Sequence, residues 1–199
     1  MTIDIDEAKV QHGEIGLWLG WTFVTAGGML LGFLLSIPLI NLLNLGFAQI
    51  IVPVLTGAII GFSQWIMLRR YVTASTHWIL ADGISWATGY ILGLFLIQVL
   101  PSTVFAGFIG YFLFGVIVAL LQWPVLRREI PHILTWILAS ALAWAAGFWA
   151  SQAVLPLFFH GPSIAPALST SVIAVTSGLV AGAITGIALI WIVRKPETI

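Results

Sequence analysis

The sequence predicts an all-α membrane protein with six transmembrane helices, built as three parallel repeats of a two-helix hairpin, pseudo-threefold about the membrane normal. Three observations predict this fold class. The 199 residues are 60% hydrophobic and only 7% charged, whereas a soluble domain carries about 25% charged residues because its surface faces water. The few charges are confined to short segments of the chain. A fourteen-residue block also occurs three times.

Three long stretches of the chain are almost free of charge. Residues 15–68 and 130–193 contain no Asp, Glu, Lys or Arg, and Asp82 is the one charged residue in 71–126. Each stretch is two to three times the ~20 apolar residues that a helix needs to cross a bilayer core of ~30 Å. Each therefore predicts a helical hairpin rather than a single helix.

Proline, glycine and polar clusters divide these stretches into six helices. The predicted helices cover residues 16–37, 47–69, 78–100, 107–127, 133–156 and 170–193. The three outer turns would then be Pro38–Ala48, Pro101–Ala106 and Pro156–Ser169. We expect the whole chain, residues 1–199, to form one transmembrane domain that includes a short cytoplasmic N-terminal segment, residues 1–15.

The repeated block ends the second, fourth and sixth helices. It covers residues 57–70, 115–128 and 182–195, with offsets of 58 and 67 residues and no gap inside the block. In the odd helices, Trp78 and Trp136 are also 58 residues apart, and Trp18 lies near the equivalent place in the first helix. The predicted repeat units are about 16–70, 78–128 and 133–195. Because a unit of two spans preserves orientation, the repeats are predicted to be parallel.

All seven basic residues are predicted to lie on one side of the membrane. Lys9 precedes the first helix, and the other six form pairs at the ends of the even helices: Arg69 and Arg70, Arg127 and Arg128, and Arg194 and Lys195. The positive-inside rule makes this side cytoplasmic, with both termini inside. We expect an integral protein of a bacterial inner membrane or a thylakoid membrane. The paired bases suit contact with anionic headgroups, at ~1 kcal/mol per base, and binding of an anionic substrate is the alternative.

The ten tryptophans are unevenly placed along the predicted helices. All but Trp149 lie toward the basic side, whereas the opposite loops carry phenylalanine. Indole rings anchor proteins at the membrane interface, but such belts normally occupy both faces. The alternative is that the inner indoles contact a bound hydrophobic molecule or another subunit. The candidate contact residues are Trp65, Trp78, Trp86, Trp123, Trp136 and Trp144.

Three polar residues lie inside the predicted spans. Gln64 and Gln122 occupy equivalent places in the repeated block, and an amide in hydrocarbon needs hydrogen-bond partners. We predict that both face the protein interior and bond to a neighbouring helix or an indole N–H, with a substrate contact as the alternative. Asp82 is the one acid inside a span, which makes it a functional candidate. We expect it to pair with His77 or an arginine, with proton or cation handling as the alternative.

Composition also bounds the function. The absence of cysteine excludes thiolate chemistry, and one aspartate with scattered serines does not assemble a catalytic site. We expect a non-enzymatic accessory, assembly or scaffold subunit without a metal site. Its partners would be the lipid bilayer, other membrane subunits or a second copy of the chain, and not nucleic acid. Its cofactor would be a bound lipid or a hydrophobic pigment. The alternative is a small-solute transporter or channel between the hairpins, which predicts a polar cavity near the midplane.

Overall fold

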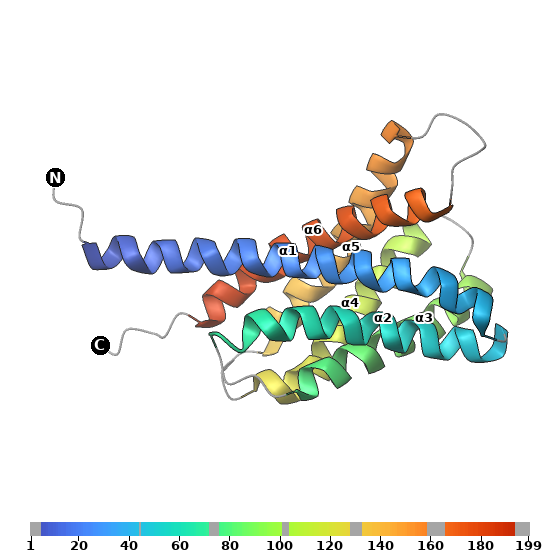
Figure 1. Ribbon diagram of the computed structural model, residues 1–199, viewed down its shortest axis with the longest axis horizontal. Helices are drawn as coiled ribbons and strands as arrows, with labels where there is room; N and C mark the ends of the chain where they lie inside the picture. The colour runs from blue at the N-terminus through green and yellow to red at the C-terminus, as the bar shows by residue number, and fades with distance from the viewer. Residues whose placement is uncertain are drawn as a thin grey trace.

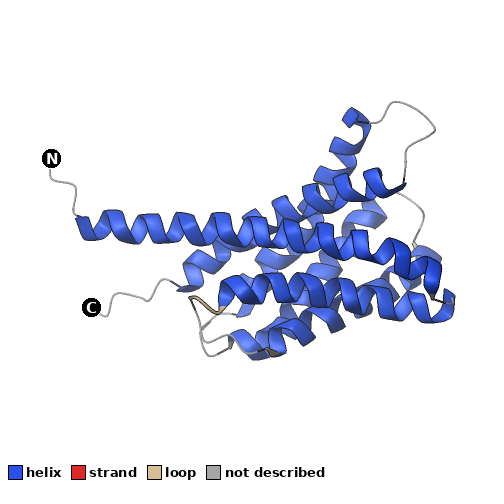
Figure 2. Cartoon of the chain, in the orientation of Figure 1, coloured by secondary structure: helices blue, strands red, loops and turns tan. Residues whose placement is uncertain are grey.

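The computed structural model describes residues 5–43, 45–71, 76–100, 104–127, 133–158 and 166–193. Six α-helices account for nearly all of these residues (Figure 1). They are α1 (Ile5–Leu42), α2 (Leu45–Leu68), α3 (His77–Val99), α4 (Val104–Leu126), α5 (Ile133–Phe158) and α6 (Pro166–Val193). The described part of the chain contains no strand (Figure 2).

Every helix contains a stretch that is long and apolar enough to cross a bilayer. These stretches are Gly13–Leu42, Phe47–Leu68, His77–Leu96, Ala106–Leu126, Ile133–Phe158 and Ala167–Trp191. Lipid offers the backbone no hydrogen-bond partners, so a chain that crosses it satisfies its N–H and C=O groups within a helix. The prediction of six long apolar helices is confirmed, and they indicate residence in a membrane.

The six helices form a closed ring. Each helix packs against its neighbours in sequence, and α1 also packs against α6. Figure 1 shows α6 alongside α1, with the start of α1 and the ends of α2 and α6 at the same end of the bundle. The interior of this ring is filled by side chains from all six helices.

The first helix is longer than the sequence predicts. It begins at Ile5 and continues through Pro38 to Leu42, and α2 begins at Leu45. The predicted turn Pro38–Ala48 is therefore wrong over most of its length. Proline removes one backbone hydrogen bond from a helix, but in membrane helices neighbouring groups and local adjustments satisfy the freed carbonyl. Proline was for this reason a poor stop signal.

The third predicted turn, Pro156–Ser169, is also shorter than expected. Helix α5 continues through Pro156 to Phe158, and α6 begins at Pro166. Proline suits the first position of a helix because the N–H that it lacks has no partner there in any case. The second turn, Pro101–Ala106, overlaps α4, and its first three residues lie outside the described residues.

Three glycines of the even helices lie at close helix crossings. A Cβ atom added at Gly57, Gly115 or Gly182 would collide with backbone atoms of α3, α5 or α1, respectively. Small residues allow this approach of one backbone to another. Each even helix thus touches the next odd helix of the ring without an intervening side chain.

Candidate functional site

Three tryptophans, one from each odd helix, meet inside the ring. Trp21, Trp78 and Trp136 are 1%, 0% and 1% exposed. The ring centroids of Trp21 and Trp78 are 6.1 Å apart, and those of Trp78 and Trp136 are 6.3 Å apart. Edge-on and tilted contacts of this kind suit the charge distribution of aromatic rings. In this conformation no molecule outside the bundle reaches these three indoles.

Two of these indoles are bonded to the two membrane glutamines. The Nε1–H of Trp78 donates to Oε1 of Gln64 over 3.2 Å, and that of Trp136 donates to Oε1 of Gln122 over 3.0 Å. In each pair the glutamine and the tryptophan are fourteen residues apart along the chain. Each bond therefore joins an odd helix to the even helix before it.

The third indole uses a different acceptor. The Nε1–H of Trp21 donates to Oγ1 of Thr185 on α6 over 2.9 Å. Leu189, one turn further along α6, is buried and offers no acceptor. Trp21 rather than Trp18 packs on Trp78: the indole of Trp18 is half-buried and bonds to a backbone carbonyl of α6.

The glutamine amides also donate to the helix before them. Nε2–H of Gln64 donates to Oγ1 of Thr25 over 3.1 Å, and Nε2–H of Gln122 donates to Oδ1 of Asp82 over 2.6 Å. Gln64 and Gln122 are only 5% and 3% exposed. The prediction that both glutamines face the interior, and that they bond to an indole N–H and to a neighbouring helix, is confirmed.

Asp82 is buried and only half satisfied. Its Oδ1 accepts the bond from Gln122, but its Oδ2 has no hydrogen-bond partner among the described residues. The expectation that Asp82 pairs with His77 or an arginine is wrong. Asp82 faces the ring interior, whereas His77 lies exposed at the start of α3, and Arg69 and Arg70 are exposed beyond the end of α2.

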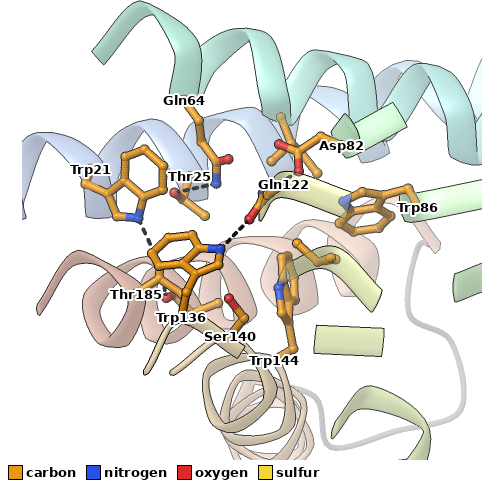
Figure 3. A pocket seen from close by; sticks show the side chains of 13 residues that line it. Trp21, Thr25, Gln64, Asp82, Trp86, Gln122, Trp136, Ser140, Trp144 and Thr185 are labelled. Carbon is orange, nitrogen blue, oxygen red and sulfur yellow. Dashed lines mark hydrogen bonds between the residues drawn. The ribbon is translucent and has the colours of Figure 1, made fainter. Parts of the chain in front are cut away.

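A small cavity lies beside Asp82, and every helix contributes one polar side chain to it. These side chains are Thr25, Gln64, Asp82, Gln122, Ser140 and Thr185. Figure 3 shows them gathered around one space between the indoles. The cavity leaves about 10 Å³ for the centre of a water-sized molecule, which is room for about one water.

A second aromatic layer bounds the cavity on the side away from Trp21 and Trp136 (Figure 3). Trp86 lies one turn beyond Asp82 on α3, and its ring is 5.6 Å from that of Trp144. Phe114 packs edge-on against both rings, at 5.2 and 5.0 Å. Trp144 is buried and Trp86 is half-buried. The polar cluster is thus enclosed between two layers of aromatic side chains.

The remaining predicted contact residues lie away from this cavity. Trp65 is half-buried, stacks on Phe62, and carries the guanidinium of Arg69 4.8 Å from its ring centroid. Trp123 is half-buried as well. A cation over an indole is a favourable surface contact, so this part of α2 suits interface anchoring.

The basic pairs are not brought into the cavity. Arg69, Arg70 and Arg127 are exposed at the ends of α2 and α4. Arg128, Arg194 and Lys195 lie outside the described residues. Among the described residues, no group of three His, Asp or Glu side chains could hold a metal ion.

Four members of the central cluster were not assigned from the sequence: Trp21, Thr25, Ser140 and Thr185. The sequence pattern indicates three of them. Trp21 and Thr25 have the same four-residue spacing as Trp78 and Asp82. Ser140 follows Trp136 at that spacing too. Thr185 has no such signal, because small hydroxyl side chains are common in membrane helices.

No protein-family model, no curated protein and no solved structure matches the chain. The geometry and chemistry of the central cluster are therefore the basis for proposing its function.

Proposed function

We propose that the chain is a small-solute transporter or channel of the membrane, with a pathway along the axis of the helix ring. The observation that carries this proposal is Oδ2 of Asp82, which is buried beside a polar cavity and has no partner among the described residues. A buried polar atom left unpaired costs about 1–3 kcal/mol. Ionisable residues inside membrane proteins mark substrate and ion pathways.

The two aromatic layers support a gated pathway rather than an open pore. Trp21 and Trp136 line the cavity on one side, with Trp78 packed against both, and Trp86 and Trp144 line it on the other. Passage through either layer requires an indole ring to rotate or two hairpins to shift. Small movements of one repeat against another are the usual way in which transporters expose a fixed site to each side in turn.

The hydrogen-bond pattern supports a pseudo-threefold repeat about the membrane normal, which we propose as the symmetry of this pathway. The same indole-to-amide bond recurs with Gln64 and Gln122, in pairs fourteen residues apart. Gly57, Gly115 and Gly182 each touch the next odd helix of the ring. An axis through the ring would place the cavity at its centre.

The orientation is proposed from the positive-inside rule, with both termini in the cytoplasm. In support, Arg69 and Arg70 follow the end of α2, which lies at the same end of the bundle as the start of α1 (Figure 1). Asp82 is five residues into α3, which corresponds to about 8 Å of helix. In this orientation the cavity lies in the cytoplasmic half, closer to that interface than the midplane expected from the sequence.

Flux measurements on reconstituted protein test the proposal. Liposomes that contain the purified chain should take up a small polar species, among protons, alkali cations and small neutral solutes, faster than protein-free liposomes. Asp82→Asn should lower that rate about tenfold or more, which is ~1.4 kcal/mol in the barrier. The matched control is Thr88→Val, which removes a polar group from the exposed face of α3. Liposomes that stay as tight as empty ones to every species would contradict the proposal.

The accessory or scaffold subunit is the second candidate, and exposed indoles favour it. Trp149 and Trp191 are 46% and 70% exposed, so they can contact lipid, another subunit or a second copy. A pigment does not fit the central cavity and would bind on this outer surface. Purification in mild detergent separates the candidates, because a partner, lipid or pigment should copurify and be lost with Trp191→Leu. In either role we propose that the chain is not an enzyme.

A further inference from the structure

We propose that the central cavity is a proton site, in which Asp82 carries a proton on Oδ2 and shares it with one enclosed water molecule. This inference rests on the proposed function, because it names the species that the same cavity takes. Its test, however, uses the purified chain and does not depend on transport.

No group that faces Asp82 can balance a negative charge. From α2 it meets Gly61 and Gln64, from α4 Gln122, and from α5 Ser140. Helices α1 and α6 add only hydroxyl groups of threonine to the same cavity. None of these side chains titrates or carries charge. An ionised carboxylate buried without a counter-charge is strongly disfavoured relative to the neutral acid.

The hydrogen bonds of a neutral acid match the geometry. Oδ1 accepts the amide N–H of Gln122 and therefore behaves as the carbonyl oxygen of the acid. Oδ2 is then the hydroxyl oxygen, and its proton needs an acceptor. Such an acceptor is missing among the described side chains. A water in the adjoining cavity can accept this proton and donate in turn to polar side chains of the lining, such as Ser140, as buried waters generally do.

A metal cation suits this cavity poorly. Cations need several oxygen ligands that point at one centre. Here Oε1 of Gln64 and Oε1 of Gln122 already accept indole N–H groups, and Oγ1 of Thr25 accepts an amide N–H. The space left is about that of one water. A proton needs no such shell.

Infrared difference spectroscopy of the purified full-length chain tests this proposal. Wild type minus Asp82→Asn at neutral pH should show the C=O stretching band of one protonated carboxyl group, shifted in D2O. The other six acidic residues lie in the terminal segments or near the charged loop at Glu129, so they cancel in the difference. Asp82→Ser, which installs the residue found at the corresponding place of α5, provides a second difference spectrum if Asp82→Asn fails to fold.

Two results would overturn the proposal. One is a difference spectrum, wild type minus the Asp82 variant, that shows carboxylate bands and no band of a protonated carboxyl group. The other is a change in tryptophan emission when sodium chloride replaces choline chloride at constant pH, abolished by either Asp82 variant, because this would show that the site takes a metal cation. A protonated carboxyl band in a protein whose liposomes stay tight would support the proton site and contradict the transporter. Solute flux in liposomes without the protonated carboxyl band would support the transporter and contradict the proton site.

Discussion

The amide of Gln122 donates a hydrogen bond of 2.6 Å to Oδ1 of Asp82, which connects α4 to α3 across 40 residues of sequence. The oxygen of the same amide accepts the indole N–H of Trp136 from α5. Gln122 thus connects three successive helices, and its side chain is almost completely shielded. Buried amides of this kind fix how helices meet, because no solvent replaces a lost partner.

Replacing Gln122 by leucine should destabilise the bundle. The change leaves the indole N–H of Trp136 and Oδ1 of Asp82 without their partner, and we expect a loss of about 1–3 kcal/mol in the free energy of unfolding. The measurement is thermal unfolding in detergent, followed by circular dichroism. Gln152→Leu is the matched control, because Gln152 is exposed on α5 and its replacement should change stability by about 0.5 kcal/mol or less. Equal melting of the two variants would show that the buried network contributes nothing.

Adding a methyl group at the close crossings should also destabilise the protein. Gly57→Ala and Gly182→Ala place a Cβ against the backbone of the facing helix, which should cost about 1–3 kcal/mol. Gly93 is also helical but has nothing within 4 Å of its Cβ position. Gly93→Ala should therefore stabilise α3 by about 0.5–1 kcal/mol, since alanine loses less backbone entropy. In thermal unfolding in detergent, the melting temperature should fall for Gly57→Ala and Gly182→Ala and rise for Gly93→Ala. A change of the same sign in all three variants would refute the crossing geometry.

Restoring the amide in the third hairpin tests the repeat. If Leu189 corresponds to Gln64 and Gln122, then Leu189→Gln places its amide between Trp21 and Ser140 and should cost about 1 kcal/mol or less. Leu68→Gln, at an equally buried position of α2 where the repeat supplies no partners, should cost about 2–5 kcal/mol. The comparison is the difference in melting temperature between the two variants. Equal destabilisation would count against the threefold arrangement.

Single cysteines test the orientation, because the chain has none of its own. Asn41→Cys lies at the predicted outer end of α1, and Tyr71→Cys lies beyond the end of α2, both at exposed positions. In intact cells a membrane-impermeant maleimide should label Asn41→Cys only. Tyr71→Cys should react after the membrane is opened. If Tyr71→Cys were labelled in intact cells and Asn41→Cys were not, the basic ends of the helices would lie outside the cell.

The helix count and the interior position of the glutamines were predictable because they depend on local chemistry. Long uncharged stretches can only span as helices in lipid, and Gln64 and Gln122 cannot remain unpaired in hydrocarbon. The ends of α1 and α5 were missed because Pro38 and Pro156 are tolerated inside membrane helices. The rule that proline ends a helix comes from soluble proteins, and it predicts turns at both positions.

The partner of Asp82 could not be read from the sequence. It depends on which face of α3 meets α4, and the helices are apolar all round, so no amphipathic pattern fixes that face. The nearest charges in sequence, His77 and the arginines, lie at the surface instead. Thr185 was not predictable for a similar reason, since it belongs to the cluster only because α6 meets α1.

The contact between α1 and α6 also constrains biosynthesis. Trp21 leaves the ribosome among the first membrane residues, but its acceptor Thr185 follows 164 residues later. Until the last helix enters the bilayer, the indole N–H of Trp21 and the close-packing face of α1 have no permanent partner. A chain truncated before α6 would keep both exposed inside the membrane, where quality-control proteases and chaperones detect unfinished proteins. A ring closed in this way also fixes the number of hairpins, because a fourth unit could join only if the first and last helices separated.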